Sequence, residues 1–230
     1  MAQPRSLDRL VDHQIRRWHL ETARRGTEPR RRCIALSRLP GSGVDELGKQ
    51  LAEALGYTLF GIEIVDRIAR KSGIQRELVE GLDERVRGAL EALLDGLRGR
   101  SPRFSESEYV NRLVRVVSTL GEVGAAVIIG RGSPYILPPE RALRVLVTAP
   151  RSERVERLAK RLDLPFAEAD ARMSREEAAR RQFIERSFHV DPDDASLYDV
   201  AVNTGTLGVD GAATLIRGAL AGAAPDTLRA

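Results

Sequence analysis

The chain contains 230 residues, of which 42% are hydrophobic, and it carries a formal net charge of +4. This length suits one folded core with an appendage, while the single cysteine excludes internal disulfides and leaves little material for zinc or redox chemistry. Because no apolar run reaches the ~20 residues that span a bilayer and the N-terminus is too charged for a secretory signal, we expect a cytoplasmic protein.

The positive charge is concentrated at the N-terminus. Residues 1–32 contain nine Arg and four acidic residues, so the rest of the chain carries a net charge of −1. A near-neutral main body does not offer the broad basic face that binds duplex nucleic acid. We therefore predict no nucleic-acid partner and no membrane partner.

An amphipathic helix is predicted near the N-terminus. Ser6 can cap this helix, and apolar residues recur every three or four positions until the pattern stops near Gly26. They are Leu7, Leu10, Val11, Ile15 and Trp18. The apolar stripe can dock on the main domain or on a second subunit, which would give a homodimer, and binding to a membrane or nucleic acid is a further interpretation. We assign residues 1–32 to this helix and a linker, 33–222 to the main domain and 223–230 to a C-terminal tail.

Five strands alternate with helix-length segments in the main domain. The apolar runs that predict them are 33–37, 57–60, 126–130, 143–149 and 199–204. Several runs are continuous rather than alternating, which is typical of parallel strands covered on both faces, and this makes Cys33 a packed strand residue. Right-handed crossovers then predict an α/β three-layer sandwich with a five-stranded parallel sheet.

The first strand leads through a glycine turn into a helix. Residues 34–43 read Ile-Ala-Leu-Ser-Arg-Leu-Pro-Gly-Ser-Gly, and a helical pattern follows over 44–55. Free N–H groups in the first turn of such a helix bind phosphate. The full loop pattern G-x-x-x-x-G-K-[ST] is not met, because Arg38, Val44 and Asp45 replace the first Gly, the Lys and the hydroxyl residue. A plain structural turn is the alternative interpretation.

Arginines follow several of the strands. Arg38 follows the first strand and Arg131 lies between two glycines after the third. Others follow the fourth strand or occupy the later helix, namely Arg151, Arg154, Arg157, Arg172, Arg175, Arg180, Arg181 and Arg186. Because ligands of open α/β sheets bind beyond the carboxyl ends of the strands, we expect several guanidinium groups at one rim. Alternatively, Arg131 satisfies a buried carboxylate and most of the helical arginines are solvated.

The order of these segments resembles the cytidylate kinase-like family. The segments that carry the resemblance are 34–43, Val-Ile-Ile-Gly-Arg-Gly at 127–132, 143–149, and Tyr-Asp-Val-Ala-Val-Asn-Thr at 198–204 with Leu207-Gly208. It covers about residues 33 to 220 and implies a P-loop kinase fold with a monophosphate-binding insertion and an arginine-rich lid. The helix around residues 14–18 also resembles an N-terminal extension found on some members.

The resemblance also implies roles for individual residues. Gly41, Ser42 and Gly43 would bind the phosphates of ATP. Arg131 would bind the acceptor monophosphate. Glu177 and Arg180 match a D-x-x-R pattern with Glu in place of Asp, which makes Arg180 the best candidate for the lid arginine.

The sequence departs from the family at two places. Val44 and Asp45 replace the Gly-Arg pair that is common in the loop of this family. Gly61 stands after the second strand where an Asp is expected, and the nearby Glu63 is then the candidate acceptor-binding carboxylate.

Phosphoryl transfer requires positive charge over the transferring group and a magnesium ion. We hypothesise that Arg38 and Arg180 supply the charge of the missing lysine. Mg²⁺ would then be held mainly by the nucleotide and water, together with Asp45. The alternative for Asp45 is that an acid in the first turn complements the helix dipole.

The resemblance implies ATP-dependent phosphorylation of a nucleoside monophosphate, with CMP or dCMP as the leading acceptor and with ATP and Mg²⁺ as cofactors. Two alternatives stay open. One is a nucleotide-binding or regulatory module that kept the fold and lost turnover. The other is a kinase that acts on a different small acceptor, because fold does not fix substrate.

The remaining polar residues suggest no further site. His13, His19 and His189 have no spacing that would form a metal site together. Asp191, Asp193 and Asp194 form an acidic loop that is compatible with a calcium-like cluster but is more typical of a turn and helix cap.

Overall fold

The structure is a computed structural model that describes residues 11, 13–16, 18–20, 31–70, 78–79, 82, 88, 90–91 and 107–222. The described part of the N-terminal segment is helical. Its predicted start at Ser6 and its predicted end near Gly26 lie outside the described residues, as does the tail 223–230.

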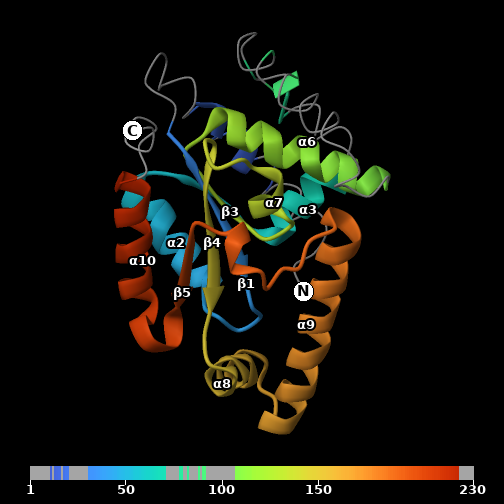
Figure 1. Cartoon of the computed structure of the whole chain (residues 1–230), viewed down its shortest axis with the longest axis vertical. Helices are drawn as coiled ribbons and strands as arrows, with labels where there is room; N and C mark the ends of the chain where they lie inside the picture. Colours follow the sequence, from blue (N-terminus) through green and yellow to red (C-terminus); the bar gives the residue numbers. More distant parts are fainter. Residues whose placement is uncertain are drawn as a thin grey trace.

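A five-stranded, all-parallel sheet forms the centre of the molecule (Figure 1). Its strands are β1 (Cys33–Arg38), β2 (Thr58–Phe60), β3 (Ala126–Ile129), β4 (Ala142–Thr148) and β5 (Val200–Asn203). They lie in the order β2-β3-β1-β4-β5, which places β1 in the middle. The predicted parallel sheet is confirmed, and each strand boundary lies within one residue of the prediction.

Helices cover both faces of this sheet. The helices of the main domain whose bounds the structure gives are α2 (Val44–Leu55), α3 (Ile62–Arg70), α6 (Glu108–Val123), α7 (Ser133–Ile136), α8 (Arg151–Leu162), α9 (Phe166–Phe188), η1 (Ala195–Leu197, a 3-10 helix) and α10 (Thr204–Gly222). α2 and α10 pack together on one face, whereas α3, α6 and α7 cover the other (Figure 1). The three-layer α/β sandwich that the sequence predicts is therefore present.

The central strand β1 is buried on both sides. Ile34 and Leu36 face the cluster under α2 and α10, while Cys33 and Ala35 face the cluster under α3 and α6. Successive side chains of a strand point to opposite faces, so both sets of side chains are buried where helices cover both sides, and polar residues enter β1 only at its carboxyl end, at Ser37 and Arg38. This explains the continuous apolar run that predicted the strand.

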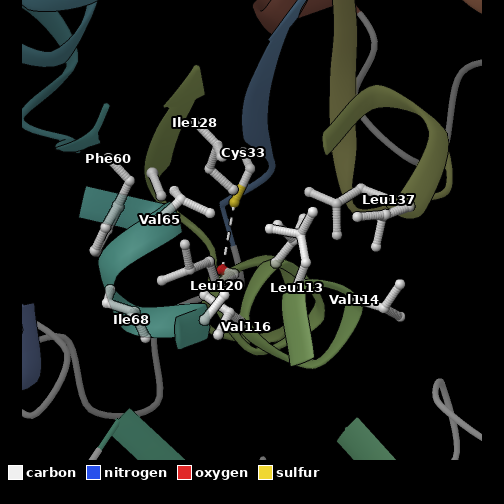
Figure 2. Close-up of a cluster of buried hydrophobic side chains, with 14 of the residues drawn as sticks. Cys33, Phe60, Val65, Ile68, Leu113, Val114, Val116, Leu120, Ile128 and Leu137 are labelled. Carbon is white, nitrogen blue, oxygen red and sulfur yellow. Dashed lines mark hydrogen bonds between the residues drawn. The ribbon is translucent and has the colours of Figure 1, made fainter. Parts of the chain in front are cut away.

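Figure 2 shows the core on the α3 and α6 side. Leu113, Val116 and Leu120 of α6 meet Val65 and Ile68 of α3 below the sheet. The thiol of Cys33 reaches into this cluster and lies 3.5 Å from the carbonyl oxygen of Leu120, to which it donates a hydrogen bond (Figure 2). Cys33 is therefore the packed strand residue that its apolar surroundings in the sequence predict.

The N-terminal helical residues pack on the same core. Val11, Ile15 and Trp18 are fully buried, and the Trp18 ring meets the Phe60 ring edge-on at 5.9 Å between centroids. Gln14 Nε2 donates a 2.5 Å hydrogen bond to the carbonyl oxygen of Leu59 in the edge strand β2. The described part of the apolar stripe thus docks on its own domain, and a homodimer through this helix stays a prediction.

The helix pair α8 and α9 forms a separate small core. Val155 and Leu158 of α8 pack against Ala169 and Met173 of α9. In Figure 1, α9 runs along one side of the domain and α10 along the other. Among the described residues, no helix is long and apolar enough to cross a membrane.

Candidate functional site

The turn between β1 and α2 has the backbone geometry of an anion-binding loop. Gly41 and Gly43 adopt positive φ angles of 77° and 76°, which disfavour side chains. Gly43 is the N-cap of α2 and provides no side-chain cap, so the N-terminal N–H groups of this helix keep the orientation that suits a bound phosphate. The hydroxyl of Thr204 donates a 2.7 Å hydrogen bond to the carbonyl oxygen of Ser42 and holds the loop against α10.

A cavity of about 530 Å³ opens in front of this turn, and we call it the loop cavity. The turn itself, the first residues of α2 and arginines from β1, α8 and α9 line it. Its polar lining includes Arg38, Ser42, Asp45, Arg157, Arg161 and Arg180. Four guanidinium groups and the carboxylates of Asp45, Glu46 and Glu176 thus surround the glycine turn, and the surplus of positive charge suits a polyanionic ligand.

A second cavity of about 230 Å³ lies beyond the ends of β1 and β3, and we call it the inner cavity. Ser37, Arg38, Arg131, Tyr135, Arg180 and Phe183 supply most of its polar and aromatic lining. Its wall includes Gly130 and Gly132, on either side of Arg131. A Cβ atom at Gly132 would lie 2.1 Å from the Phe188 ring, so only glycine allows α9 to approach this turn so closely.

Arg38 and Arg180 border both cavities. Arg38 comes from the end of β1 and Arg180 from the middle of α9, and the two guanidinium groups repel each other. Burial, together with the positive charges of Arg180 and Arg131, lowers the pKa of Arg38 to about 10, although the carboxylates of Asp45 and Glu176 oppose the shift. The mutual repulsion of the guanidinium groups would decrease if an anion bound between them.

Arg131 is the third arginine of the inner cavity and is held from two sides. Its guanidinium lies 5.8 Å from the centroid of the Phe183 ring, and Nη2 lies 3.6 Å from a carboxylate oxygen of Asp66. Asp66 also accepts hydrogen bonds from Tyr109 and Arg70. The Nε of Arg131 is buried and has no hydrogen-bond partner within the described part of the chain, so a donor remains for a ligand oxygen.

The pKa values of this cluster agree with its geometry. Burial raises the pKa of Asp66, but the hydrogen bonds from Tyr109 and Arg70 and the charge of Arg131 outweigh it, so the net shift is downward. Burial and the bond to Asp66 raise the pKa of Tyr109 to about 12. Asp66 therefore stays ionised and Tyr109 stays protonated at neutral pH, which fixes both as partners that orient Arg131.

The predicted site residues fall into three places. Arg38, Arg131 and Arg180 meet at the inner cavity, as the strand-end argument predicts. Gly41, Ser42, Gly43 and Asp45 line the loop cavity, where a carboxylate oxygen of Asp45 lies 4.0 Å from Arg161.

Glu63 lies elsewhere. It lines a third cavity of about 930 Å³ beside the edge strand β2, together with Gln14, Lys49, Glu53 and Tyr57. The structure therefore does not bring Glu63 to the cavity that contains Arg131, although its neighbour Ile62 borders both.

Other residues of the site escaped the sequence reasoning. Tyr135 and Phe183 line the inner cavity and belong to no motif, and Ser37, which also lines it, lies within the 34–43 segment but was assigned no role there. Arg157 is one of several arginines that follow the fourth strand. It lies beside the glycine turn, because a Cβ atom added at Gly43 would be 3.5 Å from its Nη1. Only its one-turn spacing from Arg154 and Arg161 in α8 hints that it shares a face with Arg161 at the loop cavity.

The acidic loop before β5 is a turn and cap, as predicted. Asp194 Oδ1 accepts hydrogen bonds from the backbone N–H and the hydroxyl of Ser196 and so caps η1. Asp191 accepts from the N–H of Asp193, and Asp193 pairs with Arg181. Within the described ranges, no group of three or more His, Cys, Asp or Glu side chains could hold a metal ion.

Comparisons with known proteins agree with this architecture. A cytidylate kinase from Desulfurococcus amylolyticus is 30% identical over 186 residues, which cover 80% of this chain and 90% of that protein. A cytidylate kinase from Aeropyrum pernix is 29% identical, with 79% of this chain and 94% of that protein covered. A crystal structure of an uncharacterized protein from Eubacterium ventriosum superposes with a TM-score of 0.64 at 20% identity and covers 84% of this chain and 99% of that one, which supports the fold.

The family model of the cytidylate kinase-like family matches residues 33–206. The match begins at the first residue of β1 and ends in the first turn of α10, so it spans the whole sheet, the glycine turn after β1 and the segments that carry Arg38, Arg131 and Arg180. This extent is well over half of the chain. The chain therefore belongs to the cytidylate kinase-like family.

Proposed function

We propose that this protein is an ATP-dependent nucleotide kinase that phosphorylates a nucleoside monophosphate, with CMP or dCMP as the acceptor. The observation that carries the proposal is that Arg38 and Arg180 border both the loop cavity and the inner cavity. A group transferred from a ligand in one cavity to a ligand in the other would pass beside both guanidinium groups. Family membership and relatives named cytidylate kinase support the activity and this choice of acceptor.

In this proposal ATP occupies the loop cavity. Its phosphates would lie along Gly41, Ser42 and Gly43, where the N-terminal dipole of α2 favours negative charge. Arg157 lies beside Gly43 and donates hydrogen bonds to the hydroxyl and the carbonyl oxygen of Thr204, which keep its side chain extended along the loop.

The acceptor monophosphate would occupy the inner cavity. Arg131 would bind it through the unpaired Nε, while Asp66 and Phe183 hold the guanidinium plane in place. An acceptor phosphate oxygen would attack the γ-phosphorus of ATP, and the bond to the bridging oxygen would break to release ADP. This reaction requires positioning and charge stabilisation rather than covalent catalysis by the protein.

Arg38 and Arg180 would replace the charge of the missing P-loop lysine. Both side chains are largely shielded from water, and a cation is worth more to a developing negative charge in such a setting than in bulk solvent. The transferring phosphoryl group would relieve the repulsion between them.

Asp45 fits a limited role toward magnesium. It is an exposed carboxylate at the loop cavity, and Mg²⁺ is commonly bound by one or two carboxylates together with substrate phosphates and water. When bound, the ion would neutralise phosphate charge. Glu63 lines a different cavity from Arg131, so its role toward the acceptor stays a prediction.

The test is a coupled ADP-release assay of the purified chain with ATP, Mg²⁺ and each nucleoside monophosphate in turn. We expect turnover that is fastest with CMP or dCMP. Arg38→Ala should lower kcat by roughly 100-fold, the usual effect of removing one preorganised donor, and Arg131→Ala should raise the KM of the acceptor. Arg172→Ala is the matched control, because Arg172 lies on α9, outside both cavities, and forms an exposed ion pair with Glu176 one turn away. Equal kinetics for all three variants and wild type would refute the site assignment.

A second candidate is a nucleotide-binding module without turnover, which the loop residues Val44 and Asp45 favour because neither supplies the usual cation or hydroxyl. Calorimetric titrations with ATP and CMP, combined with the ADP-release assay, distinguish this module from the active kinase. Binding of both ligands with no product from any monophosphate would favour the module, and product with a non-nucleotide acceptor only would indicate a different small-molecule kinase.

A further inference from the structure

A chain of hydrogen bonds runs from Arg180 into the protein interior. Arg180 Nη2 lies 2.8 Å from the hydroxyl of Ser37. Ser37 and Tyr135 line the inner cavity together, and Ser37 acts on the Tyr135 phenol as a hydrogen-bonding neighbour. The phenol of Tyr135 in turn bonds to the phenol of Tyr198. The Tyr198 hydroxyl ends the chain 2.8 Å from the carbonyl oxygen of Pro192. Four elements of the fold are joined in this way: α9, β1, α7 and the loop before β5.

The two ends determine the direction of every bond in this chain. A guanidinium can only donate and a carbonyl oxygen can only accept. Tyr198 must therefore give its single proton to Pro192, so Tyr135 donates to Tyr198 and Ser37 donates to Tyr135. The Ser37 oxygen is then left with its lone pairs for Arg180, and each hydroxyl both donates and accepts, an arrangement in which bonds strengthen one another.

The chain lies in a region that excludes most water. Ser37 and Tyr198 are buried, and Tyr135 borders the inner cavity. Burial and the neighbouring Tyr198 raise the pKa of Tyr135 above its usual range, although the hydrogen bond from Ser37 opposes this rise. The phenol therefore keeps its proton across the physiological range.

Arg180 needs such an anchor because its position is electrostatically unfavourable. The charge of Arg180 lowers the pKa of Arg38, so the two guanidinium groups repel each other while no anion lies between them. The carboxylate of Asp193 lies 3.8 Å from Arg180 Nη1, but Asp193 is exposed and also pairs with Arg181. An exposed and shared ion pair contributes little, whereas a buried hydrogen bond to a charged group contributes more.

We propose that Ser37, Tyr135 and Tyr198 are positioning residues that hold the Arg180 guanidinium in the wall between the loop cavity and the inner cavity. In this role they act through Arg180, although Ser37 and Tyr135 also line the inner cavity. The inference rests on the proposed kinase function, because it assigns these hydroxyl groups a part in transition-state stabilisation by Arg180.

The kinetic test uses Ser37→Ala and Tyr135→Phe, which remove one hydroxyl each and keep the side-chain packing nearly unchanged. We expect kcat to fall roughly tenfold, as for the loss of one hydrogen bond to a charged group. KM values should stay within about twofold, because the interaction acts in the transition state. Ser118→Ala is the matched control, since Ser118 is fully buried in α6 and its hydroxyl has no hydrogen-bond partner among the described residues. Losses of kcat in Ser118→Ala as large as in Ser37→Ala would overturn the proposal.

A double-mutant cycle tests whether the hydroxyl acts through Arg180. In an Arg180→Ala background, Ser37→Ala should cause no further loss of kcat, because the group that it positions is already absent. Fully additive losses would show that Ser37 acts by another route and would overturn the proposal.

A readout without turnover separates this inference from the proposed function. The side-chain NMR signals of Arg180 report rotation of its guanidinium, which should be slow in wild type and in Ser118→Ala but fast in Ser37→Ala and Tyr135→Phe. Equal rotation rates in all four proteins would refute the anchor. If no monophosphate is phosphorylated while the rotation rates differ as expected, the kinase function fails and the anchoring of Arg180 stands.

Discussion

Arg154 Nη1 of α8 donates a 2.5 Å hydrogen bond to Glu177 Oε1 of α9. The same nitrogen lies 3.2 Å from the carbonyl oxygen of Pro40, and Arg154 Nε lies 2.9 Å from that of Ala149. Arg154 thus connects the glycine turn after β1, the end of β4 and α9 through one nearly buried side chain. The Glu177 and Arg180 pair that the sequence singled out therefore has divided roles, because Glu177 anchors α9 and Arg180 lines both cavities.

The first prediction concerns this anchor. Glu177→Gln should lower the free energy of unfolding by about 1–3 kcal/mol, because Arg154 loses its charged partner while its side chain is only 7% exposed. Urea denaturation measures the effect. Glu185→Gln, which breaks an exposed pair with Arg181 on the same helix, should change stability by about 0.5 kcal/mol or less. An equal loss in both variants would contradict the anchoring role.

The second prediction concerns the turn. Gly41→Ala should abolish ATP binding, because a Cβ atom there would lie 2.5 Å from the carbonyl oxygen of Arg154 and the φ angle is 77°. Gly56→Ala is the control, since Gly56 also has a positive φ but no atom within 4 Å of the added Cβ. The Gly56→Ala substitution should lower the free energy of unfolding by about 1 kcal/mol through backbone strain alone and leave ATP binding intact. Calorimetry and thermal unfolding of both variants measure these effects, and normal ATP binding by Gly41→Ala would refute the close approach.

The third prediction follows from the lowered pKa of Arg38, about 10 in the folded chain. Arg38 is a cation below this pH and loses its proton above it, so the attraction for an anion decreases as the pH rises. ATP affinity should fall roughly fourfold between about pH 8.5 and about pH 10.5 if only the protonated form binds. Calorimetric titrations at the two pH values measure this. In Arg38→Ala the ATP affinity should decrease much less over this pH range. An identical pH dependence of the affinity in the variant and in wild type would show that a group other than Arg38 loses the proton.

The fourth prediction concerns the link between β4 and the start of β5. Asp199 accepts hydrogen bonds from the backbone N–H and the guanidinium of Arg144 at 2.8, 3.2 and 2.6 Å. Burial raises the pKa of Asp199, but these bonds outweigh it and the net pKa lies below 3.8. The folded state therefore binds its proton less readily than the unfolded state, and the stabilisation is complete above that value and disappears as the pH falls through the folded pKa.

Accordingly, Asp199→Asn should lower the free energy of unfolding by about 1–3 kcal/mol at neutral pH, and the difference from wild type should shrink in acid. Denaturant titrations at several pH values test this. Asp210→Asn serves as the control, because the Asp210 carboxylate accepts a single exposed hydrogen bond, from Gln50, among the described residues. A difference for Asp199→Asn that stays constant down to about pH 2 would contradict the linkage.

The sheet could be predicted from the sequence because its strands are buried on both faces. Ile34, Ala35 and Leu36 are all inaccessible to water, so the strand reads as one apolar run. The short helix α7 carries no such pattern. It begins at Ser133 and Pro134 directly after Gly132, whose positive φ of 74° reverses the chain, and four residues are too few for a helical period to show.

The convergence of Arg38, Arg131 and Arg180 was predictable in part, since parallel strands bring their carboxyl ends to one edge. The separation of Glu63 from them was not. Consecutive residues of a helix point about 100° apart, so Ile62 reaches the inner cavity while Glu63 faces the β2 edge. The contact between Ser37 and Arg180 spans 143 positions and follows no motif, so only the folded chain reveals it.

The burial of Cys33 in the core beneath β1 has a practical consequence. It is the sole thiol of the chain and is shielded from solvent, so a cysteine introduced on the outer face of α9 would be the one readily labelled position in the native protein. Fluorophores or spin labels could then test whether α9 moves when ATP is added, in an otherwise unaltered background.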